Sequence, residues 1–122
     1  MDKKCLIADY DPWELKLLSV FAERFGFQVA QAYQGQDIYA LARSTQPDVI
    51  LLEGNLPGNL TPKDVLQLLN TSWETRDIPV VVIISADRVV TAPALQEAAS
   101  FLRKPATYED FVQVMADVGI NF

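Results

Sequence analysis

Residues 47–58 form the stretch Pro47-Asp48-Val49-Ile50-Leu51-Leu52-Glu53-Gly54-Asn55-Leu56-Pro57-Gly58. Its centre, residues 49–53, is a short run of large apolar side chains that ends on an acid. A continuous apolar run of this length is typical of a parallel strand that is covered on both faces. We therefore predict a buried strand over residues 49–53.

Four further runs of this kind lie on either side, at residues 4–8, 28–32, 80–84 and 101–103. Segments with helical length and period lie between and after them, beginning near Pro12, Gly35, Thr61, Thr91 and Thr107. Repeated alternation of strand and helix requires right-handed crossovers and predicts a mostly parallel, doubly wound α/β sheet with helices on both faces. No linker or low-complexity tract divides residues 1–122, so we expect a single domain.

Local signals mark where several of the predicted helices begin and end. Asp11, Thr61 and Thr107 each lie three residues before an acid, which is the spacing of a helix N-terminal cap. Gly26 and Gly119 follow the first and last helices, where a left-handed residue would end them. The helix boundaries are therefore well defined by sequence.

Apolar stripes indicate which side of a helix covers the sheet. The first predicted helix carries Leu15, Leu18, Ala22 and Phe25 on one side, and the last carries Phe111, Val114, Met115 and Val118. Because large aromatic side chains dominate packing, we expect Trp13 and Trp73 to be packing anchors without a recognition role.

Composition excludes several classes of function. The chain has 10 Lys and Arg against 16 Asp and Glu, and its net charge of −6 opposes binding to nucleic acid or anionic membranes. Histidine is absent, which removes the commonest general base and metal ligand, and we expect no enzymatic activity. The single Cys5 lies in an apolar run and is expected to be a buried, inert thiol. No stretch approaches a signal sequence or a membrane span, so we expect a cytoplasmic protein.

Polar residues follow the predicted strands at the point where each strand ends. They are Asp9, Tyr10 and Asp11 after the first strand, Glu53 and Asn55 at the third, Ser85 after the fourth, and Lys104 after the fifth. The carboxyl ends of parallel strands meet at one edge of a sheet, where ligands of such folds bind. Acids, a hydroxyl and an ammonium at one edge suit a phosphoryl or other anionic group.

The ordered blocks resemble those of response-regulator receiver domains, the phosphoacceptor modules of two-component signalling. The matching blocks are residues 6–12, 47–58, 77–81, 84–86 and 101–105, which span nearly the whole chain. The resemblance implies a flavodoxin-like fold with strand order 2-1-3-4-5. It also implies signalling, and dimerisation as in the family, through a protein-contact face made by the fourth helix, fifth strand and fifth helix. The interval from Ser85 to Lys104 is shorter than is usual in the family, so we expect the helix near Thr91 to be short, irregular or shifted and the partner surface to be remodelled.

The family's site residues carry over only in part. Asp9 matches the first metal-binding acid, Asn55 the metal-binding backbone position, Ser85 the hydroxyl, Lys104 the lysine and Phe101 the aromatic switch residue. Tyr10 stands at the principal metal-ligand position, and Glu53 stands at the phosphoacceptor aspartate. The resemblance also permits a cis bond between Lys104 and Pro105.

Both departures act against phosphoryl transfer. Tyr10 removes an anionic ligand, so Asp9, Glu53 and Asn55 would hold Mg²⁺ weakly if at all, and no other cofactor is expected. Glu53 adds one methylene, which displaces the nucleophilic oxygen in a reaction where an error of about 1 Å can cost ~10²-fold in rate. Glu53 would either reach Lys104 and fix one conformation, or form a partly buried ion pair with no further role.

Other residues of the set also have structural alternatives. Asp11 is explained as a helix cap, Tyr10 as a ring packed at the edge of the sheet and Phe101 as a core residue of a short strand.

Three functions remain as hypotheses. The first is an atypical receiver that signals through protein contacts without phosphorylation. The second is a working phosphoacceptor that uses Asp9 or another acid in place of Glu53. The third is a flavodoxin-like binder of a small ligand, although no glycine-rich phosphate loop follows the first strand.

Overall fold

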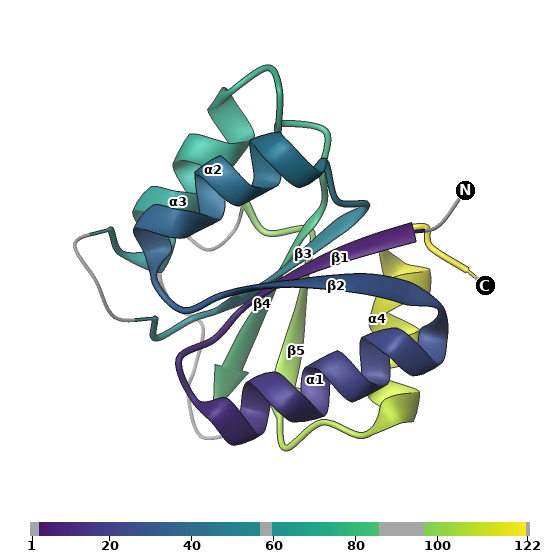
Figure 1. The fold of residues 1–122 in the computed structure, drawn as a ribbon. Helices are drawn as coiled ribbons and strands as arrows, with labels where there is room; N and C mark the ends of the chain where they lie inside the picture. The colour runs from purple at the N-terminus through teal and green to yellow at the C-terminus, as the bar shows by residue number, and fades with distance from the viewer. Residues whose placement is uncertain (1–2, 57–59, 86–96, 122) are drawn as a thin grey trace.

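The computed structural model describes residues 3–56, 60–85 and 97–121. Five parallel strands form one sheet with the predicted order β2-β1-β3-β4-β5 (Figure 1). The strands are β1 (Lys3–Ala8), β2 (Phe27–Ala32), β3 (Val49–Glu53), β4 (Val80–Ser85) and β5 (Ser100–Lys104). Each of the five predicted strands is therefore confirmed to within one residue at either end.

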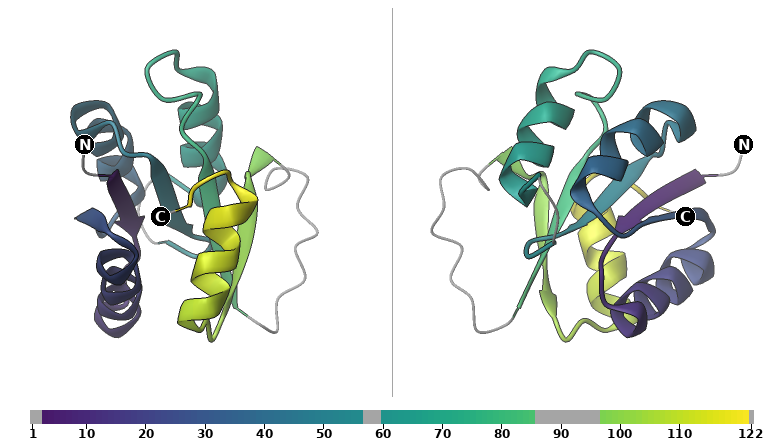
Figure 2. Two further views of the ribbon diagram at one scale, coloured as in Figure 1. Left: turned by 90° about the vertical axis from the view of Figure 1, so that its right-hand side faces the viewer. Right: turned by 60° about the vertical axis from the view of Figure 1, so that its left-hand side comes forward.

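The helices lie in two layers, one on each face of the sheet (Figure 2). They are α1 (Pro12–Phe25), α2 (Gly35–Thr45), α3 (Pro62–Thr71) and α4 (Tyr108–Asp117). Helices α1 and α4 cover one face, and α2 and α3 cover the other. The helix predicted to begin near Thr91, the fourth in the predicted order, lies outside the described residues. Helix α4 therefore corresponds to the fifth predicted helix, which was expected to begin near Thr107. None of the described helices combines the length and the apolar character needed to cross a membrane.

Strand β3 shows why its sequence is continuously apolar. All five of its residues are buried. Leu51 packs with α1 and α4, whereas Ile50 and Leu52 pack with α2 and α3. Successive side chains of a strand point to opposite faces, so a strand with helices on both sides has no residue left for solvent.

The predicted caps set the ends of the helices. The Asp11 side chain caps α1, and Thr61 and Thr107 each exchange two hydrogen bonds with the acid three residues later. Gly26 and Gly119 have the left-handed φ angles of +112° and +86° that favour glycine after a helix. These caps fix the points at which the chain leaves the edge of the sheet and enters each helix.

The two tryptophans contradict the expectation that they are packing anchors. Trp13 is 82% exposed and Trp73 is 78% exposed. In α1 the predicted stripe that includes Leu15 and Leu18 does face the sheet, and Trp13 lies on the other side of the helix. Burial of an aromatic residue depends on which side of the helix it occupies, and the size of its side chain does not determine this.

Candidate functional site

The parallel register brings the polar strand ends to one edge of the sheet. Ser85 pairs directly with Lys104 across β4 and β5, and Glu53 ends the neighbouring β3. Asp9 follows β1, and its backbone N–H donates to the carbonyl of Ala32 at 3.1 Å. The edge therefore gathers the residues that the sequence placed there.

Glu53 is the most constrained acid of the site. Its side chain is 3% exposed. Oε1 accepts a hydrogen bond from the backbone N–H of Asn55 at 3.1 Å, and Oε2 accepts one from the ammonium of Lys104. The predicted contact between Glu53 and Lys104 is thus present, and both carboxylate oxygens are engaged.

Asp9 lies beside this pair and is fully buried. Its Oδ1 accepts a hydrogen bond from the backbone N–H of Asp11 at 3.0 Å. Its Oδ2 lies 3.7 Å from Nζ of Lys104 and has no hydrogen-bond partner within the described parts of the chain. Lys104 therefore serves as the shared counter-charge of two buried carboxylates.

Burial and the ion pair have opposite effects on these groups. Burial raises the pKa of Glu53, and the hydrogen bond and positive charge of Lys104 offset this only in part. Burial would lower the pKa of Lys104, but Glu53, Asp9 and Glu14 outweigh it and raise that pKa above its usual value. The lysine is therefore held firmly in its charged form.

Glu14 also interacts electrostatically with the groups of the site. In the sequence it is the acid three residues after Asp11, where it indicated only the start of a helix. Burial raises its pKa, Lys104 lowers it, and Asp9 and Asp11 raise it further. The signal in the sequence is its position one turn into α1, since the first turn of that helix begins at the edge of the sheet. Glu14 is thus the third acid, after Glu53 and Asp9, that interacts with Lys104.

The remaining predicted residues lie around this centre. Tyr10 is 49% exposed, and Asp11 is an exposed N-cap whose Oδ1 accepts from the backbone N–H of Trp13 at 3.0 Å. Phe101 and Ser85 are half-buried. The Lys104–Pro105 peptide bond is cis. Asp11 is thus a helix cap, as the alternative for this residue proposed.

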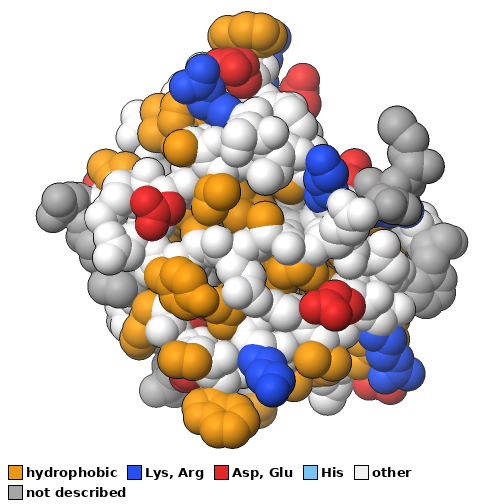
Figure 3. Space-filling view, viewed as in Figure 1, with side chains coloured by type: hydrophobic (Ala, Val, Ile, Leu, Met, Phe, Trp, Pro, Cys, Tyr) orange, Lys and Arg blue, Asp and Glu red, His pale blue; other side chains and the backbone are white. Residues whose placement is uncertain are grey.

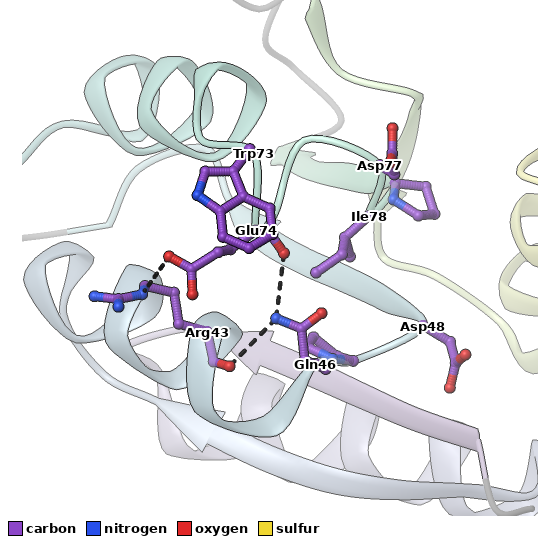
Figure 4. A pocket seen from close by; sticks show the side chains of 9 residues that line it. Arg43, Gln46, Asp48, Trp73, Glu74, Asp77 and Ile78 are labelled. Atoms are coloured by element: carbon purple, nitrogen blue, oxygen red, sulfur yellow. Dashed lines mark hydrogen bonds and ion pairs between the residues drawn. The ribbon is translucent and has the colours of Figure 1, made fainter.

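A separate hollow lies at the opposite, amino-terminal edge of the sheet (Figure 4). Exposed Trp73 stands over it, with an ion pair of 3.1 Å between Arg43 and Glu74 beneath. Gln46 donates to the carbonyl of Glu74 at 3.2 Å and so ties α2 to the segment after α3. None of the predicted site residues lines this hollow.

A doubly wound sheet with acids, a hydroxyl and a lysine at its carboxyl edge defines an α/β module with a polar site at the ends of its parallel strands. Residues 5–116 match the family described as response regulator receiver domain, and the chain belongs to that family. It is a receiver domain of two-component signalling, with a flavodoxin-like fold.

Relatives of this chain include both single-domain and longer proteins. It is 32% identical to protein PilH of Pseudomonas aeruginosa over 114 residues, which cover 92% of this chain and 93% of PilH. It is 29% identical to response regulator GacA of the same organism over 97% of this chain but only 55% of GacA. A putative response regulator from Chloroflexus aurantiacus has the same fold, with a TM-score of 0.88 at 19% identity, over 98% of this chain and 100% of that one.

The family implies a Mg²⁺ ion, and the donors at this edge do not fit one. Among the oxygens of Asp9 and Glu53, both of Glu53 and one of Asp9 accept hydrogen bonds, which leaves only Oδ2 of Asp9 without a hydrogen bond in the described structure. The described residues contain no group of three or more His, Cys, Asp or Glu side chains arranged to hold a metal. Mg²⁺ requires near-octahedral oxygen coordination, which this set does not supply.

Proposed function

We propose that this chain is an atypical receiver domain that signals through protein contacts without being phosphorylated. The observation that carries the proposal is the state of the Glu53 carboxylate. It is almost completely buried and bonded at both oxygens, to Asn55 and to Lys104. The nucleophilic oxygen in phosphoryl transfer must be aligned with the phosphorus atom, whereas these two hydrogen bonds fix the Glu53 carboxylate in the orientation of the ion pair.

The positive charge of the site supports the same proposal. Lys104 interacts with Glu53, Asp9 and Glu14. An incoming phosphoryl group would have to compete for Lys104 with carboxylates that are already in place. We infer that the Glu53–Lys104 pair holds the edge of the sheet in one arrangement.

The signal leaves through a protein-contact face, which we place on the side formed by β5 and α4. A hollow there is lined by Phe101 and Lys104 of β5, by Pro105 directly after it, and by Asp110 and Val114 of α4. Lys104 lies both at this hollow and in the ion pair with Glu53. A change in the ion pair between Glu53 and Lys104 would therefore reach this face through β5 alone.

Phosphorylation on Asp9 is the competing function, and the unpaired Oδ2 of Asp9 favours it. This oxygen is the only carboxylate oxygen of Asp9 and Glu53 that lacks a hydrogen bond in the described structure. Asp9 is nevertheless fully buried, so a phosphodonor would need the edge to open before reaching it.

The test is a titration with beryllofluoride and Mg²⁺, followed by amide NMR spectra, with acetyl phosphate and intact mass as a second readout. The wild-type chain should show neither shifts nor a phosphoryl adduct. The double variant Tyr10→Asp with Glu53→Asp should respond, and each single variant serves as the matched control. A stoichiometric adduct on the wild type would refute the proposal, and peptide mapping of that adduct to Asp9 would establish the competing function.

A further inference from the structure

Helix α1 is apolar on the side that faces solvent as well as on the side that faces the sheet. Trp13 is 82% exposed, Val20 is 51% exposed and Leu17 is 40% exposed. Positions i, i+4 and i+7 of a helix share one stripe, so these three side chains form a continuous outward row. A helix on a protein surface normally carries polar residues on this side.

The row continues onto the neighbouring edge of the sheet. Val20 lines a shallow hollow together with Pro12 of α1 and Tyr33, which follows β2 and is 54% exposed. Figure 3 shows hydrophobic side chains along the lower border of the molecule, where α1 lies in Figure 1. Allowing about 150–250 Å² for each aromatic side chain, the patch exposes on the order of 400–500 Å². Patches of this size on a monomer are often functional.

We propose that this patch pairs with the same patch on a second copy of the chain, with the two α1 helices antiparallel. In the pairing that places Leu17 against Val20 of the second copy, Val20 meets Leu17 in return. Trp13 then lies opposite Arg24 of the second copy. One two-fold axis therefore covers the whole row in both copies, as an isologous interface requires.

Charge complementarity on the same helix favours a second copy as the occupant. Lys16 and Glu23 are both exposed and line the same hollow beside the row, so they lie on the same flank of α1. In the antiparallel pairing Lys16 lies close to Glu23 of the second copy, and symmetry forms this ion pair twice. An unrelated partner would have to carry an acid opposite Lys16 and a base opposite Glu23, whereas a second copy of this chain already provides both charges.

The expected dimer is weak and depends on salt. Two patches of this size bury about 800–1,000 Å² in total, which is in the range of weak, transient interfaces. Each copy carries a net charge of −6, and this repulsion is screened beyond about 8 Å at physiological ionic strength. Dimerisation should therefore strengthen as salt rises from very low to physiological concentration.

Sedimentation equilibrium of the full chain over a range of protein and salt concentrations tests the proposal. The wild type should show a monomer–dimer equilibrium, and Trp13→Ser and Val20→Glu should each weaken it by roughly tenfold or more. Trp73→Ser is the matched control, because it removes the other exposed tryptophan and should leave the equilibrium unchanged. In the Trp73→Phe variant, emission from Trp13 should shift to shorter wavelength as the dimer forms.

A charge-swap cycle tests the geometry of the pairing. Lys16→Glu and Glu23→Lys should each weaken the dimer, and the double variant should restore it, because the ion pair forms again with reversed sign. A chain that stays monomeric throughout would overturn the proposal. A dimer that persists in Val20→Glu would also overturn it. The same holds if the double charge-swap variant dimerises as weakly as the single variants, even where another surface or partner then accounts for the dimer.

Discussion

Replacing Lys104 with Met should strongly destabilise this protein, because Lys104 is the counter-charge of two buried acids. The carboxylate of Glu53 is 3% exposed and that of Asp9 is fully buried, and both lie beside Nζ of Lys104. Removing one partner of a buried ion pair costs roughly 3–5 kcal/mol, since the remaining charge is buried without compensation. The Lys104 side chain is itself 22% exposed, so we expect a loss near the lower limit, about 3 kcal/mol.

The assay is urea unfolding followed by far-ultraviolet circular dichroism, because both tryptophans are exposed and report the core poorly. The triple variant Asp9→Asn, Glu53→Gln and Lys104→Met is the matched control, because it removes the lysine together with both buried carboxylates. It should lie within about 1 kcal/mol of the wild type, because replacing a whole buried set of paired charges by neutral groups is often neutral. A Lys104→Met variant within about 0.5 kcal/mol of the wild type would refute the reasoning.

The pH dependence of this loss has a definite sign. Burial already raises the pKa of Glu53 above its ordinary value of 4.5, and Lys104 acts to lower it. In Lys104→Met that lowering is absent, so the folded state takes up a proton on Glu53 at higher pH than the wild type does. A group whose pKa is raised in the folded state stabilises that state as pH falls. The difference in the free energy of unfolding between Lys104→Met and the wild type should therefore become smaller from pH 7 toward pH 5.

Two further predictions concern the core and one tight contact. Burial raises the pKa of the Cys5 thiol far above its ordinary value of 9.0. A disulfide reagent at pH 8 should therefore label the native protein only as fast as it unfolds. Rapid stoichiometric labelling would contradict this burial. Gly35→Ala should lower the free energy of unfolding in urea by about 1–3 kcal/mol, because a β-carbon there would lie 2.6 Å from the carbonyl oxygen of Leu60. An unchanged unfolding midpoint would contradict this and show that the backbones at Gly35 and Leu60 move apart easily.

Local sequence contains enough information for the strands, the caps and the membership of the carboxyl edge. The apolar run ending at Glu53 predicts a strand buried on both sides, and the capping residue Thr61 predicts the start of a helix, because each depends on neighbours a few residues away. The edge residues follow from topology, since parallel strands in one sheet must end on the same side. The resemblance to receivers added the strand order, which the sheet confirms.

The tertiary structure was needed to assign the individual hydrogen bonds at that edge. The sequence predicted a contact between Glu53 and Lys104, but not which oxygen of Glu53 bonds Lys104 and which bonds Asn55, because the two side chains lie 51 residues apart and their geometry depends on the register of β3, β4 and β5. It gave no sign that Oδ2 of Asp9 is buried without a hydrogen bond, since burial is a property of the assembled layers. The exposure of Trp13 was likewise mispredicted, because the expectation rested on the size of its aromatic ring, whereas Trp13 lies outside the apolar stripe of α1 that faces the sheet. Helix and strand are encoded locally, whereas orientation and charge pairing arise only when distant segments pack together.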